Sequence, residues 1–300
     1  MFALDDISSL RAFISIAEHS SFSKAAESLQ ITQPAISKRI ALLEENLSEK
    51  LFDRLGRKIV LTEAGATLLP KCRQILETVN DAELLANNLG GKIEGILRLG
   101  TSHHIGLHHL PPVIREFGQQ YENVELELHF MSSEQVCEKV LQAELDMGII
   151  TLPLSTPNTL IAKPIWLDDM RAVVGENHEL AKQEIVTLET LTHYNALLPE
   201  RGTYTHKIIE NIFIQNGLQP ITKLSTNYLE TIKMMVSVGL GWSILPTTII
   251  DDDLEILDIP HFSLTRQLGY VQHQQRTASN AAVAMMGLLN QIRNEESAQL

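Results

Sequence analysis

With 37 acidic and 24 basic side chains, this chain of 300 residues has a formal net charge of −13, so any surface that binds nucleic acid must be local. The length is sufficient for two or three domains. The first residues, MFALDD, do not form a secretory signal, and no apolar stretch approaches the roughly 20 residues of a membrane-spanning helix. We therefore expect a cytoplasmic protein with no membrane segment.

Residues 20–65 predict a winged helix-turn-helix. Ser21 or Ser23 can cap a first helix, and residues 30–32 form a tight turn. Thr32 stands at the N-cap of a second helix, where Pro34 fits the first turn because its missing N–H has no intrahelical partner there. The second helix has an apolar stripe that we expect to be buried, formed by Ile36, Ile40, Leu43 and Leu47.

The remaining faces of this segment, and the basic hairpin after it, carry side chains that suit DNA. Glutamine can bond adenine bidentately, serine reaches bases or phosphates, and lysine and arginine reach guanine or phosphate. A basic hairpin suits the phosphate backbone or the minor groove. A small helical core with a solvated, charged surface is the alternative. The residues expected to contact double-stranded DNA are Ser23, Lys24, Thr32, Gln33, Pro34, Ser37, Lys38, Arg39, Arg54 and Arg57.

The distribution of charge agrees with this assignment. Residues 21–62 contain seven basic and five acidic side chains, which gives this segment a charge of +2. The negative charge of the chain therefore lies elsewhere, where it repels phosphate. The basic segment is left as the expected DNA-binding face.

A long helix is predicted from Glu63 to Asn88. Its apolar residues form an interrupted seam of the kind found in coiled coils, with Leu69, Cys72, Leu76, Val79 and Ala86 along it and Leu68, Ile75 and Leu85 beside it. The length favours pairing with a second copy, whereas packing on its own domain is the alternative. Gly90 and Gly91 then mark a hinge and a domain boundary.

From Gly95 onward, short apolar strands alternate with amphipathic helices. This alternation predicts parallel, doubly wound sheets in two α/β lobes. The expected strands are 96–101, 124–130, 145–151, 195–198, 221–226 and 242–245, and the expected helices are 110–121, 133–144, 203–216 and 228–238.

The stretch SFSKAAESLQITQPAISKRIALLEENL, followed by LFDR and GRKIVLTEAG, closely resembles the LysR-type transcriptional regulators. The resemblance implies an α/β protein in three parts: an α-rich winged helix-turn-helix domain (1–65), a linker or dimerisation helix with a hinge (66–90), and a two-lobed α/β effector domain (91–300) similar to periplasmic binding proteins. It places lobe one in 91–162 and 267–300 and lobe two in 163–266, with 268–273 completing the first sheet and a helix at 278–293 packed on it. One departure is Ser48, where the family usually has a glycine that ends the helix more readily.

The same resemblance implies a function: a sequence-specific DNA-binding regulator, not an enzyme, controlled by a small effector that we expect to be anionic. It implies a homodimer or homotetramer that binds promoter DNA and contacts RNA polymerase, and it implies no cofactor. The sequence contains no phosphate loop, nucleophile elbow or zinc protease motif. A solute-binding protein is the alternative, but that class predicts an export signal and no base-reading helix.

Ligands in α/β folds bind at the carboxyl ends of parallel strands and at helix N-termini. Short hydroxyl side chains with free backbone N–H groups at these places suit a carboxylate or another small anion, although such residues also commonly cap helices. Arg201 offers a positive charge that Glu200 can neutralise. The expected effector-binding residues are Thr101, Ser102, His103, Ser132, Ser133, Thr151, Arg201, Gly202, Thr203, Thr226 and Asn227.

A histidine cluster, His103, His104, His108 and His109, lies at the mouth of this expected pocket. His104 and His108 share one helical face, so a transition metal is one alternative. No cysteine, aspartate or glutamate lies within the cluster, so we expect effector contact by one or two histidines and no metal site.

The two cysteines, Cys72 and Cys137, are too few and too far apart for a disulfide framework or a zinc cluster. We expect both to be buried as small hydrophobic side chains, with a redox-sensing pair as the alternative.

Overall fold

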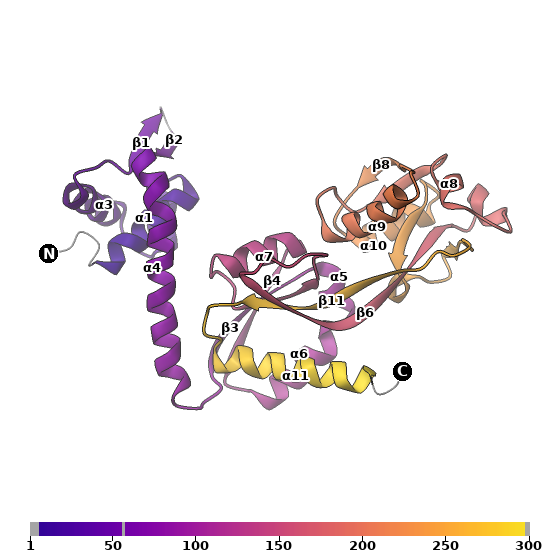
Figure 1. Ribbon diagram of the computed structural model, residues 1–300. Helices are drawn as coiled ribbons and strands as arrows, with labels where there is room; N and C mark the ends of the chain where they lie inside the picture. The colour runs from indigo at the N-terminus through magenta and orange to yellow at the C-terminus, as the bar shows by residue number, and fades with distance from the viewer. Residues whose placement is uncertain (1–5, 56–57, 298–300) are drawn as a thin grey trace. The chain divides into compact units, whose positions relative to one another are not determined.

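The computed structural model describes residues 6–55 and 58–297, and the chain divides into two compact units, Met1–Leu89 and Gly90–Leu300 (Figure 1). The elements of the first unit are α1 (Ile7–His19), α2 (Phe22–Ser28), α3 (Gln33–Leu47), β1 (Phe52–Leu55), β2 (Lys58–Leu61) and α4 (Glu63–Asn88). Strands β1 and β2 pair in antiparallel fashion and form the wing.

The caps of the helix-turn-helix agree with the sequence analysis. Ser21, and not Ser23, is the N-cap of α2, because its hydroxyl accepts a hydrogen bond from the Lys24 N–H. The Thr32 hydroxyl accepts from the Ala35 N–H at the start of α3. Ile36, Ile40 and Leu43 of α3 are buried against α1 and α2, whereas Leu47, the fourth residue of the predicted stripe, is only partly buried because it lies at the end of the helix. Helix α1, for which the sequence analysis made no prediction, supplies Leu10, Phe13 and Ile16 to the same core.

The two halves of helix α4 lie in different environments, in agreement with the interrupted seam that the sequence predicts. Its first half packs into the core of its own unit through Leu68, Leu69, Cys72, Ile75 and Leu76. Its second half does not, since Leu85 is 55% exposed and Leu89, just beyond its end, is 89% exposed. Apolar residues occur in both halves, so their presence in the sequence does not by itself show which half packs on its own unit.

Lobe one of the second unit is a sheet covered by helices on both faces. Strands β3 (Gly95–Thr101), β4 (Val124–Phe130) and β5 (Met147–Thr151) run parallel, as expected. Helices α6 (Leu110–Gln120) and α11 (Asn280–Ser297) cover one face, and α7 (Ser133–Leu141) covers the other (Figure 1). The approach of α7 is close: a Cβ atom at Gly148 would lie 2.2 Å from Cγ1 of Val136. A short helix that the sequence analysis missed, α5 (His103–His108), precedes α6.

Lobe two lies along the same pair of long strands as lobe one, β6 (Leu160–Gly175) and β11 (Leu264–His273). Parallel strands β7 (Asn195–Leu198) and β8 (Ile221–Ser225) match the predicted pairing, and Ala196 forms a parallel bridge to Trp242. The remaining elements are η1 (Glu179–Lys182), α8 (Leu188–Leu191), α9 (Tyr204–Gln215), α10 (Leu229–Ser237), β9 (Ser243–Pro246), η2 (Thr247–Ile249) and β10 (Leu254–Ile256).

Two long strands, β6 (Leu160–Gly175) and β11 (Leu264–His273), pass through both lobes. They pair with each other in antiparallel register, and β11 also pairs antiparallel with β5, while β9 and β10 pair antiparallel with β6. The expectation of wholly parallel sheets is therefore wrong for these strands. Alternation of strands and helices could not reveal them, because both strands cross between lobes without an intervening helix.

The hydrophobic cores show where the chain passes from one lobe to the other. Ile165 and Trp166 pack in the core of lobe one, whereas Met170 packs in the core of lobe two. On β11 the change falls between Leu264 and Leu268. The crossing on β6 thus lies a few residues after the position expected near residues 162 and 163, because a continuous strand has no composition break at its crossing point.

Ser48 follows α3 with φ 56° and ψ 26°, the left-handed conformation that a residue without Cβ adopts most easily. We predict that Ser48→Gly raises the free energy of unfolding by roughly 0.5–1 kcal/mol. Ser48→Ala is the matched control, because it keeps the Cβ atom. Urea unfolding measures both variants, and equal stability of the glycine variant and the native protein would contradict the prediction.

Candidate DNA interface and effector cleft

The predicted DNA-contacting residues of α2 and α3 lie on the surface of the first unit. The Ser23 hydroxyl donates to Oε1 of Gln33 over 3.3 Å, which links the two helices of the motif. The exposed members of the set are Ser23, Lys24, Thr32, Gln33, Pro34, Ser37 and Lys38. A helix with an exposed, polar N-terminal end is the arrangement that reads base edges in a major groove.

The other three predicted residues are Arg39, Arg54 and Arg57. Arg39 is half-buried, and its charge acts on Asp6, whose pKa is lowered chiefly by hydrogen bonds from Ser8 and Ser9 and further by this guanidinium. Arg54 lies in β1 of the wing. Arg57 lies outside the described residues.

Two adjoining pockets lie between the lobes of the second unit. The inner pocket has a cavity volume of about 50 Å³, and the outer pocket about 340 Å³. They share Ser102, Ser132 and Asn227, so they form one cleft. The structure brings eight of the eleven predicted effector residues to this cleft: Ser102, His103, Ser132, Ser133, Thr151, Thr203, Thr226 and Asn227.

Three predicted effector residues are not part of the cleft lining. Thr101 is fully buried, and its hydroxyl donates to the carbonyl of Ile149 over 2.8 Å, so it serves the sheet. Arg201 lines a different pocket beside His206 and Phe213. Gly202 belongs to the loop before α9, at φ 97°, and is exposed. Thr101 does lie at the carboxyl end of β3, as the prediction assumed, but its side chain is bonded within the sheet and does not line the cleft.

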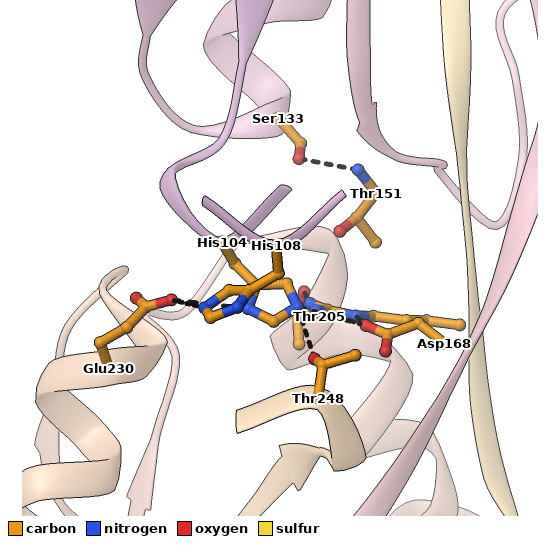
Figure 2. Close-up of polar contacts among 9 residues, drawn as sticks. His104, His108, Ser133, Thr151, Asp168, Thr205, Glu230 and Thr248 are labelled. Atoms are coloured by element: carbon orange, nitrogen blue, oxygen red, sulfur yellow. Dashed lines mark hydrogen bonds and ion pairs between the residues drawn. The ribbon is translucent and has the colours of Figure 1, made fainter. Parts of the chain in front are cut away.

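Several hydroxyl groups that line the cleft also cap the N-termini of helices. Ser132 forms a capping box with Gln135 at the N-terminus of α7, and the Ser133 hydroxyl accepts from the Thr151 N–H over 3.2 Å (Figure 2). Thr203 caps α9 by accepting from the His206 N–H. The capping alternative therefore holds for Ser132 and Thr203, which line the cleft and cap helices together.

A buried ion pair at the floor of the cleft escaped the sequence analysis. Arg266 is 3% exposed and Asp168 is 2% exposed. Nε and Nη2 of Arg266 both lie 2.7 Å from Oδ2 of Asp168, and Nη1 donates to the Thr205 hydroxyl over 2.9 Å. These two residues are register partners on β6 and β11, at the crossing between the lobes. Only strand pairing brings positions 98 residues apart together, so no local pattern could have identified them.

A second inter-lobe contact was also missed. The carboxylate of Glu134, at the start of α7 in lobe one, accepts a hydrogen bond from the backbone N–H of Tyr204, the first residue of α9 in lobe two. This carboxylate thus sits at a helix N-terminus, the position that favours an anion.

The histidine cluster is divided between several environments. His103 packs against the rings of Phe130 and Tyr228 at the outer pocket. His109 packs on Trp166, and burial lowers its pKa to about 4.

His104 and His108 share one face of α5, as expected, with ring centroids 4.9 Å apart. His104 is buried, which lowers its pKa. The carboxylate of Glu230, from α10 in lobe two, lies beside both imidazoles (Figure 2). Hydrogen bonding with His104, chiefly, lowers the pKa of Glu230 to about 2.

Both cysteines are buried and carry free thiols, as predicted. Burial raises the pKa of Cys72 to about 11 and also raises the pKa of Cys137. Because the thiolate is the reactive form, these environments disfavour the redox-sensing alternative.

Comparisons with known proteins agree with this two-part geometry. Residues 7–66 match the family model "Bacterial regulatory helix-turn-helix protein, lysR family", and residues 90–293 match "LysR substrate binding domain". The chain is 31% identical over 284 residues to a "Probable RuBisCO transcriptional regulator" of Thalassiosira pseudonana, covering 91% of this chain and 92% of that protein.

Solved structures share the fold at lower identity. A full-length variant of OxyR from Pseudomonas aeruginosa is similar with a TM-score of 0.70 and 22% identity, covering 96% of this chain and 94% of that one. Full-length CbnR complexed with its target DNA is similar with a TM-score of 0.63 and 19% identity, covering 97% and 99%.

These findings define a class: DNA-binding transcriptional regulators with a ligand-binding domain. The chain belongs to the LysR family of transcriptional regulators, whose activity is controlled by effectors. Among the described residues, no helix combines the length and apolar character needed to span a membrane.

We predict that Arg266→Met lowers the free energy of unfolding by about 3–5 kcal/mol, because it leaves Asp168 buried without its countercharge. The double variant Asp168→Leu with Arg266→Met removes both charges and should lose markedly less. Urea unfolding of both variants checks this, and an equal loss in both would show that packing, rather than the unpaired charge, sets the cost.

Proposed function

We propose that this regulator binds promoter DNA through the exposed N-terminal end of α3 and the wing, and that a small anionic effector in the inter-lobe cleft controls it. The observation that carries the effector proposal is the convergence of two helix N-termini, those of α7 and α9, on one polar cleft between two lobes. Helix N-termini favour negative charge through their free N–H groups and their dipoles.

The contact of Glu134 with α9 supports an anion in particular. In this structure a carboxylate from lobe one already occupies the N-terminus of α9 in lobe two. An effector carboxylate or oxyanion would replace the Glu134 side chain and accept the hydrogen bond of the same Tyr204 N–H group. Arg266, which lines the inner pocket, is paired with Asp168, so we propose that backbone N–H groups and hydroxyls bind the anion rather than a free guanidinium.

We further propose a homodimer, paired into tetramers, in which the exposed second half of α4 contributes to the contact between copies. A two-fold pair of recognition helices would match a two-fold symmetric DNA site. The regulator would act in the cytoplasm on promoter DNA and alter transcription through RNA polymerase. We propose that the cleft binds its ligand without transforming it, and that no cofactor takes part.

Gln33→Ala and Lys38→Ala should each weaken specific DNA binding by roughly 1–3 kcal/mol, because each removes an exposed group suited to a base edge or phosphate. The operator is first selected from a random-sequence DNA pool, and fluorescence anisotropy then measures affinity for it. Asn46→Ala, an exposed polar residue in the last turn of the same helix, is the control. Unchanged affinity in both test variants would refute the proposed reading surface.

A panel of small carboxylates, amino acids, aromatic acids and sulfur or phosphate oxyanions should contain a ligand that raises the thermal unfolding midpoint. At 100 times its dissociation constant a ligand adds about 2.7 kcal/mol, which corresponds to several degrees. Ser102→Ala with Thr203→Val should abolish that ligand-induced shift. Thr187→Val, which removes the cap of α8 away from the cleft, should retain it. A full shift in the double variant would exclude the cleft as the binding site.

A further inference from the structure

The imidazoles of His104 and His108 face a carboxylate from the opposite lobe. Both histidines lie on α5 in lobe one, and Glu230 lies in the first turn of α10 in lobe two. Figure 2 shows the two rings side by side, with Glu230 on one side and Asp168 on the other. We call His104, His108 and Glu230 the inter-lobe triad.

The separations in this triad match those of metal ligands. Oε1 of Glu230 lies 3.5 Å from Nδ1 of His104 and 3.2 Å from Nε2 of His108. The three ligand atoms all lie within 4.8 Å of one another. In a tetrahedral zinc site with bonds of about 2.0–2.1 Å, neighbouring ligand atoms are about 3.3 Å apart. A small movement of the two imidazoles toward each other would complete that geometry.

The orientation of His104 supports the same reading. Its side chain is 4% exposed, and its buried Nδ1 atom faces Oε1 of Glu230 over 3.5 Å. Its other nitrogen, Nε2, lies 3.4 Å from the Thr248 hydroxyl and 3.7 Å from Oδ2 of Asp168. A metal-binding histidine usually directs its second nitrogen to a carboxylate, which fixes the tautomer and leaves the first nitrogen free to bind the ion.

A neighbouring set, His104, His109 and Asp168, also has its ligand atoms within 4.8 Å. In that set the carboxylate of Asp168 already accepts a hydrogen bond from Nε of Arg266 and forms an ion pair with its guanidinium. Glu230 has no such cationic partner among its described contacts, which are with the two imidazoles. The inter-lobe triad is therefore the better ligand set.

We propose that His104, His108 and Glu230 bind one Zn²⁺ ion between the two lobes. Two imidazole nitrogens and one carboxylate oxygen form a ligand set that zinc favours, with a fourth position open to water or to a further ligand. Because the ligands come from both lobes, the ion would stabilise the closed arrangement of the cleft. The three ligands are not among the residues proposed to bind the anionic effector, although His104 also lines the inner pocket, so either proposal can fail without the other.

The test is equilibrium dialysis of the full-length chain against Zn²⁺, with Co²⁺ as a spectroscopic substitute. We expect one ion per chain, visible absorption bands of tetrahedral Co²⁺, and a higher thermal unfolding midpoint with Zn²⁺. His108→Gln and Glu230→Gln should each weaken binding at least tenfold. His108 is only partly buried, at 31% side-chain exposure, so its replacement is compatible with folding.

His129→Gln is the matched control, since His129 is an exposed histidine on β4 that lies 3.8 Å from the carboxylate of Glu127 and belongs to no group of three possible ligands among the described residues. It should bind Zn²⁺ as tightly as the native chain. Absence of stoichiometric binding by the native chain, or equal affinity in the His108→Gln variant, would overturn the proposal. A loss in His129→Gln as large as that in His108→Gln would overturn it as well.

Discussion

The antiparallel pairing of β6 with β11 is the interaction on which the second unit depends, because both lobes are built along these two strands. The pairing runs from Leu264 opposite Met170 to His273 opposite Leu160. At the crossing, Arg266 and Asp168 are register partners and form a buried ion pair. Burying two charges is costly unless they are paired and hydrogen-bonded, and here Nε of Arg266 donates to Asp168 while Nη1 donates to the Thr205 hydroxyl. The cleft is therefore anchored at its floor by the same strands that connect its walls.

This arrangement explains why the polar groups on the walls of the cleft lie at the N-termini of helices. The carboxyl ends of β3, β4 and β5 point toward the gap between the lobes, and α5 and α7 begin there. Lobe two directs the first residues of α9 and α10 to the same gap. Hydroxyls that cap these helices are thus also the hydroxyls available to a ligand. The hydrogen bond from the Tyr204 N–H to Glu134 joins the two walls of the cleft.

In the first unit, the two halves of α4 also differ in their surroundings. One helix begins at the wing, packs its first two turns or more into the winged helix-turn-helix core, and then continues with exposed leucine side chains. The apolar residues of its first half are buried or partly buried in that core, whereas Leu85 in its second half is largely exposed. In the second unit the histidines of α5 are divided in a comparable way, because His103 and His109 pack on aromatic rings while His104 and His108 face Glu230.

The sequence by itself determined the local features: the caps Ser21 and Thr32, the buried stripe of α3, the parallel strands β3, β4 and β5, and eight of the eleven residues expected at the cleft. These follow from spacing and from capping chemistry, which act over a few residues. The tertiary structure decided what depends on contacts between distant segments. The Thr101 hydroxyl bonds to the carbonyl of Ile149, and Arg266 forms an ion pair with Asp168. Glu230 contacts His108, which lies 122 residues away in sequence. The periodicity of the sequence does not predict these contacts, because strand pairing and the packing of the lobes, rather than neighbouring residues, bring the groups together.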